Sequence, residues 1–260
     1  MKFNIRYIFF LFLIYLIYKK IYFKDNYLEK YTQVKKAIVF IEFENHPYLK
    51  KTLEDILKYK NSDWNLILVT GNKVNINSLP ENVTYININV QLKKNISNIS
   101  EYNKLLKNKD FWNLIDAEHI QILNIDSGFC NDTKKLDDFL KYEYIGCSYD
   151  INKWNSKHRG SGSFSFRKKS FMIKCIESYP DLVNTDYPPE DGFYSMCLVD
   201  NKDKYGYNDP NHEEINNYCV YNTFNNDQDA PLGMNISYVK KEVKDWLDTK
   251  CNIGKHLLRR

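Results

Sequence analysis

Apolar residues in the first half of the chain form short, near-continuous runs that alternate with stretches of helical spacing. The runs at 35–43 (KKAIVFIEF), 64–70 (WNLILVT) and 119–126 (HIQILNID) predict strands that are covered on both faces. The segment 47–59 has leucine and isoleucine at helical spacing, and a second helix is expected over 101–115. Strands that alternate with helices predict an α/β domain with a mixed, mostly parallel sheet flanked by helices.

The remaining elements are shorter. Residues 83–90 (VTYININV) alternate between apolar and polar side chains, which is typical of a half-buried strand. Two further strands are expected, over 142–149 (YEYIGCSY) and 164–167 (FSFR). Ser170 is the expected N-cap residue of the next helix, and another helix is expected to begin after the two prolines 188–189.

The most hydrophobic stretch of the chain is Tyr7–Tyr18 (YIFFLFLIYLIY), with basic residues on both sides. A membrane span normally needs about 20 apolar residues, and flanking lysines that reach the interface can extend a shorter one. We expect an uncleaved signal-anchor over 1–24, a short stem over 25–35 and one domain over 36–260. This predicts a single-pass membrane protein with its main domain lumenal or extracytoplasmic. A cleaved signal peptide or an interfacial helix are alternatives, although no small-x-small cleavage site follows the run.

Charge and cysteine content limit the classes of function. The 37 basic and 33 acidic residues nearly balance, without long runs of like charge, so nucleic-acid binding is not expected. The six cysteines lack C-x-x-C or any other zinc-site spacing. They would form one to three disulfides in an oxidising compartment and would be free thiols in the cytosol, and the sequence leaves both open.

Two motifs lie where a ligand could bind. Asp126 follows a predicted strand, and ligands of open α/β sheets bind outside the carboxyl ends of strands. Its carboxylate could hold a divalent cation that bridges a diphosphate, or it could simply cap a turn. The small residues of 160–163 (GSGS) could let a ligand approach the backbone, or could form a flexible loop or bulge.

A third motif is the adjacent acid pair Glu190 and Asp191, at the expected start of a helix. The helix dipole favours acids at this position whatever their role. A carboxylate in a cleft can also act as a general base that takes a proton from an attacking hydroxyl.

The motifs together resemble a known family. In chain order they read NIDSG, KYEYIGCSY, GSGSFSFRKKSFM, PPEDGFYSM and APLGMNISY. This order resembles a family of GT-A-type glycosyltransferase-like proteins, first catalogued as a domain of unknown function and found in bacteria, eukaryotes and large DNA viruses. That family shows T-D-S, Y-D-Y-I-G-A-P-W, G-N-G-G-F-S-L-R, E-D-x-x-F and a late G-x-H. β-1,4-Galactosyltransferases have a similar order of metal-binding acid, glycine-rich segment and acid pair.

The resemblance implies a GT-A-like fold and a role for each matching residue. Asp126 would bind the metal and the diphosphate, with Asn235 at the position of the family's metal-binding histidine. Glu190 and Asp191 would supply the catalytic base. The residues implied for donor and acceptor binding are Asn124, Ser127, Gly160, Gly162, Ser163, Phe164 and Arg167. The nucleotide would lie near 40–43.

The resemblance implies an inverting, metal-assisted glycosyltransferase that uses Mn²⁺ or Mg²⁺. The donor would be a nucleotide-sugar, such as a UDP-sugar, and the acceptor a hydroxyl group of a glycan, protein or lipid. Asn124 and Asn235 are neutral where the family has charged or stronger ligands. The alternative is therefore a catalytically degraded GT-A-like protein that binds a glycan or a partner. A hydrolase is less favoured, because adjacent carboxylates do not flank a substrate as glycoside hydrolysis requires.

Overall fold

The computed structural model describes residues 35–148, 157–221, 229–237 and 239–258, which belong to one compact unit, Lys35–Arg260. The predicted signal-anchor, and the predicted stem apart from Lys35, lie outside the described residues. Within the described ranges, no helix has the length and apolar character needed to cross a membrane.

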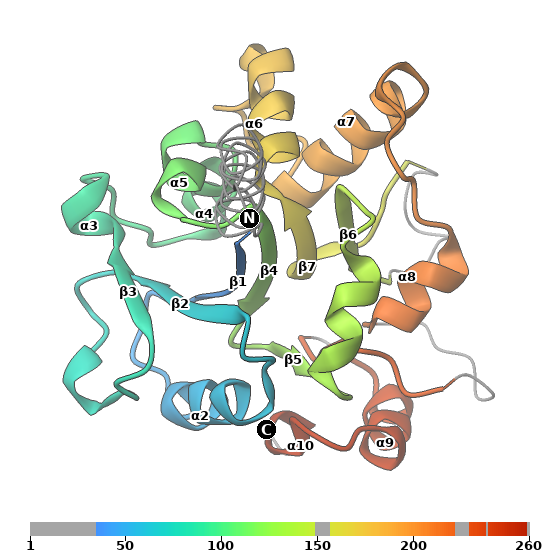
Figure 1. Ribbon diagram of the computed structural model, residues 1–260. Helices are drawn as coiled ribbons and strands as arrows, with labels where there is room; N and C mark the ends of the chain where they lie inside the picture. Colours follow the sequence, from blue (N-terminus) through green and yellow to red (C-terminus); the bar gives the residue numbers. More distant parts are fainter. Residues whose placement is uncertain (1–34, 149–156, 222–228, 238, 259–260) are drawn as a thin grey trace, which may run out of the picture. The chain divides into compact units, whose positions relative to one another are not determined.

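A mixed sheet forms the centre of this unit (Figure 1). Among the described residues it has six strands in the order β3-β2-β1-β4-β7-β6. The first four in this order are mutually parallel, whereas β7 is antiparallel to both β4 and β6. Their bounds are β1 (Lys36–Ile41), β2 (Trp64–Thr70), β3 (Thr84–Asn87), β4 (His119–Asn124), β6 (Tyr144–Cys147) and β7 (Ser161–Lys168). The prediction of a mixed, mostly parallel sheet is confirmed.

Both faces of the sheet are covered by helices, as the near-continuous apolar runs predict. Alternate residues of a strand point to opposite faces, so Val39 and Ile41 face one layer while Ile38 and Phe40 face the other. The first layer contains α4 (Ile99–Leu106), α5 (Lys109–Leu114), α6 (Lys169–Ser178) and α7 (Glu190–Tyr205). The second contains α2 (Leu49–Tyr59) and α8 (His212–Tyr218).

A smaller sheet continues from the end of β4. Among the described residues it contains β5 (Ser127–Phe129), β9 (Gly233–Asn235) and β8 (Cys219–Val220), in the order β5-β9-β8. It packs against α9 (Lys241–Lys250) and α10 (Lys255–Leu258). In the β5–β9 pair, Ser127 lies opposite Asn235. Two motifs that are distant in the sequence thus become neighbours.

Four local predictions were wrong in detail. The strand expected over 164–167 begins earlier, at Ser161, so three of the four small residues 160–163 belong to β7. The strand predicted over 83–90 ends at Asn87, whose side chain accepts the N–H of Asn89 and begins α3 (Ile88–Gln91). The helix expected over 101–115 is divided into α4 and α5, because Asn108 caps a new helix. Ser170 is not an N-cap residue, since α6 begins one residue earlier, directly after β7. The other short helices are η1 (Ile76–Ser78), η2 (Thr133–Phe139) and η3 (Pro180–Leu182).

Disulfides join elements of both sheets and the helical layer. All six cysteines lie in the described part of the chain, and they pair as Cys130–Cys251, Cys147–Cys219 and Cys175–Cys197. The first joins the residue after β5 to the residue after α9, the second joins β6 to β8, and the third joins α6 to α7. Of the two cysteine states that the sequence left open, the structure has the paired one.

Candidate functional site

A cavity of about 600 Å³ opens at the carboxyl ends of β1 and β4. These two strands are adjacent, and the chain order of the parallel strands reverses between them, which is where open α/β sheets bind ligands. Five segments line the cavity: 41–44 after β1, 96–103 at the start of α4, 124–126 after β4, 161–163 at the start of β7, and 189–191 at the start of α7. The fold thus gathers the three candidate motifs around one space.

Asp126 lies in the turn between β4 and β5. Its backbone carbonyl accepts the N–H of Ile236 at 2.8 Å. Its side-chain Oδ1 is buried without a hydrogen-bond partner. A buried carboxylate oxygen without a donor is costly, and Asp126 lines the cavity. This oxygen is therefore suited to binding a cation or a donor group of a ligand.

Asn124 uses its side chain inside the protein. Its Oδ1 accepts the hydroxyl of Tyr102 at 3.0 Å, and its Nδ2 donates to the carbonyl of Ile41 at 3.2 Å. Asn124 thereby joins the ends of β1 and β4 to α4 at the edge of the cavity.

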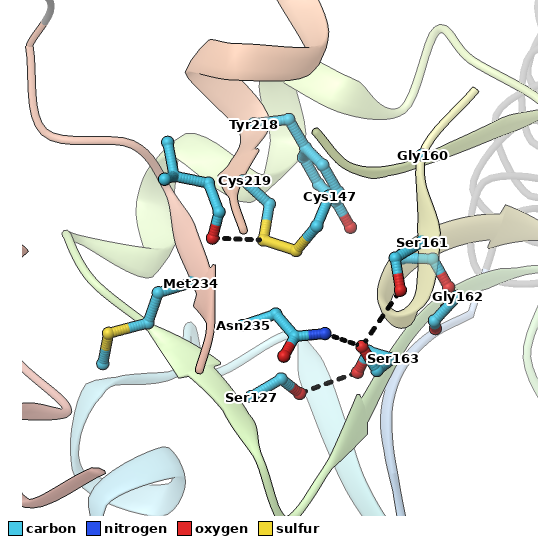
Figure 2. The surroundings of a disulfide bond; sticks show 12 residues. Ser127, Cys147, Gly160, Ser161, Gly162, Ser163, Tyr218, Cys219, Met234 and Asn235 are labelled. Atoms are coloured by element: carbon cyan, nitrogen blue, oxygen red, sulfur yellow. Dashed lines mark hydrogen bonds between the residues drawn. A yellow bond between two sulfur atoms is a disulfide. The ribbon is translucent and has the colours of Figure 1, made fainter. Parts of the chain in front are cut away.

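The segment 160–163, at the start of β7, is held by β5 and β9 (Figure 2). The Ser127 hydroxyl accepts the N–H of Asn124 at 3.0 Å and donates to the carbonyl of Ser163 at 2.7 Å. Asn235 donates through Nδ2 to the Ser163 hydroxyl, which also lies 3.3 Å from that of Ser161. The small sheet therefore fixes the conformation of this segment at the edge of the cavity.

Asn235 itself is almost completely buried, at 2% exposure. Its Oδ1 accepts both the N–H of Ser237, at 2.9 Å, and the hydroxyl of Ser237, at 2.6 Å. Oδ1, the Asn235 atom that would bind a metal, thus already accepts two hydrogen bonds from Ser237.

Gly160 and Gly162 are close to the protein's own atoms. Gly160 has a φ of +102°, and a Cβ there would lie 2.3 Å from the carbonyl carbon of Gly146 in β6. A Cβ on Gly162 would lie 1.9 Å from Oε1 of Glu190. The space left by the missing side chains is thus occupied by Gly146 of β6 and by the Glu190 side chain.

Glu190 is locked in an ion pair. The Arg167 guanidinium donates to its two carboxylate oxygens at 2.6 and 2.9 Å, and both side chains are buried. Arg167 also donates to the Ser165 hydroxyl and the Gly162 carbonyl. Burial lowers the pKa of Arg167, but the Glu190 carboxylate raises that pKa above its ordinary value. The guanidinium is surrounded by the rings of Trp112, Tyr144 and Tyr194. Both oxygens of Glu190 are thus committed to Arg167.

Asp191 has a different environment. Its carboxylate accepts the N–H of Gly192 at 2.7 Å and that of Gly162 at 3.3 Å, and Nε2 of His158 lies 3.8 Å away. Because Nδ1 of His158 accepts the N–H of Gly160 at 3.0 Å, a neutral ring carries its proton on Nε2, facing Asp191. Burial raises the pKa of Asp191, but His158 and the N–H groups of Gly192 and Gly162 together lower it below its ordinary value. Asp191 is therefore ionised at neutral pH and lines the cavity.

The remaining predicted site residues lie behind the cavity. Phe164 is fully buried between the rings of Phe129 and Tyr218, with centroids 5.4 and 5.3 Å away. Six predicted residues line the cavity: Asn124, Asp126, Gly162, Ser163, Glu190 and Asp191. Five others support it without lining it: Ser127, Gly160, Phe164, Arg167 and Asn235.

Glu42, which lines the cavity after β1, is not among the site residues predicted from the sequence. One of its oxygens accepts the N–H groups of Phe43 and Glu44, at 2.8 and 2.9 Å. Burial raises the pKa of Glu42, although these N–H groups oppose the shift. A signal was present, because an acid follows β1 just as Asp126 follows β4. Tyr102 and Asn103 also line the cavity, and nothing in their local pattern distinguishes them.

Comparison with known proteins gives one family match. Residues 85–235 match the model of a family described as "Protein of unknown function (DUF5672)". A search of curated proteins finds no match.

Two solved structures show a distant similarity. The crystal structure of the glycosyltransferase GlyE in Streptococcus pneumoniae TIGR4 has 11% identity and a TM-score of 0.44, covering 87% of this chain and 63% of that one. The apo-form of the same glycosyltransferase has 14% identity and a TM-score of 0.43, covering 86% and 62%. The chain thus spans less than two thirds of the length of these structures.

Proposed function

We propose that this chain, which belongs to the DUF5672 family, is a GT-A-type glycosyltransferase that moves a sugar from a nucleotide-sugar to a hydroxyl acceptor. One observation carries the proposal: a cavity at the reversal point of the sheet holds two carboxylates, on Asp126 and Asp191, in different environments. The matched family region includes the NIDSG, GSGS and ED motifs. Their order, which resembles GT-A glycosyltransferases, supports the same reading.

The donor would bind against the ends of β1 and β4. Five of the described residues that line the cavity are acidic, namely Glu42, Glu44, Asp126, Glu190 and Asp191, and none of the described lining residues is lysine, arginine or histidine. This surface would repel a diphosphate unless a cation accompanied it.

The chemistry of Asp126 fits a divalent cation such as Mn²⁺ or Mg²⁺, because its buried Oδ1 has no hydrogen-bond partner and such ions prefer oxygen ligands. A bound cation would neutralise the charge of the leaving diphosphate. Within the described residues, no group of three or more His, Cys, Asp or Glu side chains is placed to hold a metal. Asp126 would therefore be the main protein ligand, with further oxygens coming from the diphosphate and water.

Asp191 would be the base of the reaction. It is ionised, lines the cavity and is oriented by the N–H groups of Gly162 and Gly192. It would take the proton of the acceptor hydroxyl as this hydroxyl attacks the sugar. Attack opposite to the leaving diphosphate inverts the sugar carbon. Glu190, held by Arg167, would instead keep the start of α7 in place.

The disulfides support a lumenal or extracytoplasmic location. Every cysteine in the described part of the chain is paired, which is typical of proteins that fold in an oxidising compartment. The run Tyr7–Tyr18, outside the described residues, is the proposed membrane anchor. Alkaline extraction of membranes that carry the full chain tests this: release into the soluble fraction would rule out an integral anchor.

A non-catalytic binding protein is the second candidate. The side-chain oxygens of Asn124 and Asn235 are both engaged by protein donors, so these positions add little to a metal site. Calorimetry with UDP and Mn²⁺ separates two forms of this candidate. Binding without turnover would indicate a degraded enzyme, and the absence of binding at millimolar UDP would indicate a different ligand.

The catalytic proposal is tested by nucleotide release from a panel of nucleotide-sugars with Mn²⁺. Asp191→Asn should reduce the rate by about 10²- to 10⁴-fold, as expected for the loss of a general base. Asp203→Asn, an exposed position near the other end of α7, is the matched control and should leave the rate unchanged. Equal rates for wild type and Asp191→Asn with every donor would reject the proposal.

A further inference from the structure

Lys107 is a buried lysine at the C-terminal end of α4, with 1% of its surface exposed. Its ammonium group donates to three backbone carbonyls: those of Leu182 at 3.1 Å, Thr185 at 2.7 Å and Pro188 at 3.1 Å. A lysine ammonium group has three N–H donors, and all three are used by carbonyls of one segment, 182–188. Burying an ammonium group is costly, and burial lowers the pKa of Lys107.

The stretch that Lys107 holds, 182–188, leads directly into the acid pair. It connects η3 to α7. The first residue of α7 has a further contact with α4, because the N–H of Glu190 donates to Oδ1 of Asn103 at 3.2 Å. The residue before it, Pro189, offers no side-chain cap. Two residues of α4 therefore fix the path of the chain into α7.

The same helix also contacts the other side of the cavity. Tyr102 donates its hydroxyl to Asn124 at the end of β4, and Asn98, Ile99 and Asn103 line the cavity. Helix α4 therefore connects the strand end that carries Asp126 to the helix start that carries Asp191. A shift of 182–188 would move Asp191 relative to Asp126.

We infer that Lys107 is a positioning residue, whose ammonium group holds the segment 182–188 so that Asp191 faces the cavity. This inference rests on the proposed function only in naming Asp191 as the base. A purely structural role is the competing explanation, since Lys107 also lies 5.7 Å from the centre of the Phe193 ring. The two explanations differ in where the effect of a substitution appears.

Hydrogen exchange of the full chain tests the local effect. In Lys107→Met, the amides of 183–190 should exchange at least about 10-fold faster, while those of β1 and β4 keep their wild-type rates. Lys104→Met is the matched control. Lys104 lies on the same helix and pairs with Asp186 in the same segment at 3.1 Å, but both side chains are more than one third exposed, so little change is expected.

Kinetics test the positioning role. Lys107→Met should lower kcat for transfer by about 100-fold, as expected for a small misplacement of a catalytic group, and should leave the affinity for UDP within twofold. A rate of exchange that rises equally along the chain, or a loss of UDP affinity as large as the loss of kcat, would overturn the inference in favour of a structural role.

Chemical rescue gives a readout that does not depend on turnover. In Lys107→Ala, ethylammonium should restore the protection of 183–190, whereas ethanol at the same concentration should not. Equal effects of the two additives would contradict a role for the charge. If the wild type transfers no sugar, the proposed function fails, while exchange and rescue still decide whether Lys107 holds the segment.

Discussion

Arg167 and Glu190 form a buried two-point ion pair, with N–O distances of 2.6 and 2.9 Å. This pair separates the roles of two acids that are adjacent in the sequence. Consecutive residues of a helix point about 100° apart. Glu190 therefore faces Arg167, while the Asp191 carboxylate accepts the N–H of Gly162 and lies near the His158 ring. Arg167, 23 positions earlier in the chain, thus engages both oxygens of Glu190 and leaves the Asp191 carboxylate to other partners.

Removal of one partner should destabilise the protein strongly. Arg167→Met leaves the Glu190 carboxylate buried and uncompensated, which should lower the free energy of unfolding by about 3–5 kcal/mol. The double variant Arg167→Met, Glu190→Leu should recover most of this loss, because no lone charge remains. Urea unfolding measures both. A double variant no more stable than Arg167→Met would contradict the prediction.

Gly162→Ala, at the start of β7, should disrupt the same ion pair. The new Cβ would lie 1.9 Å from Oε1 of Glu190 and 2.7 Å from Nη2 of Arg167, so the ion pair must shift, at a cost of about 1–3 kcal/mol or more. Gly192→Ala is the control, because its Cβ would meet only ordinary contacts, the nearest at 3.5 Å, and alanine favours a helix. The melting temperature should fall for Gly162→Ala and stay level or rise for Gly192→Ala.

The pH dependence of transfer should identify the base. The pKa of Asp191 lies below its ordinary value, and the base acts when ionised. The rate should therefore stay constant as pH falls from 7 to about 5 and decline only below about 4. His158→Phe removes the largest of the groups that lower this pKa, so the decline should move to higher pH. An unchanged acid limb in His158→Phe would show that Asp191 is not the titrating base.

Nucleotide binding should require a divalent cation. Without one, the acidic lining of the cavity repels the diphosphate, so EDTA should weaken UDP binding by about 10-fold or more, equivalent to about 1.4 kcal/mol. Asp126→Asn should cause a similar loss in the presence of Mn²⁺. The exposed Asp138 provides the control variant Asp138→Asn. UDP affinity that is indifferent to EDTA in the wild type would contradict this prediction.

Much of the fold was predictable because its signals are local. The strands β1, β2 and β4 are apolar runs, which can be recognised in the sequence without knowing which strands pair with them. The same runs predict that Asp126 follows a strand and lies where the parallel strands have their carboxyl ends. By contrast, 83–90 has the alternation of a strand, but the Asn87 side chain captures the N–H of Asn89 and starts a helix.

The roles of individual site residues were less predictable because they depend on contacts across the fold. Glu190 is ion-paired with Arg167 on β7, and the Asn235 side chain is hydrogen-bonded to Ser163 and Ser237. The burial of Lys107 has no local signal in the sequence, since lysine side chains are mostly exposed. Its burial is decided by the segment 182–188, which returns to it from beyond α6.

The Cys130–Cys251 disulfide has a consequence for the integrity of the chain. It joins residues 121 positions apart, and the segment 160–163, Arg167, the segment 182–188 and the acid pair all lie between them. These parts therefore belong to one covalent ring. A protease that cut this ring once would open it without releasing a fragment, so the nicked chain would separate into two pieces only after reduction.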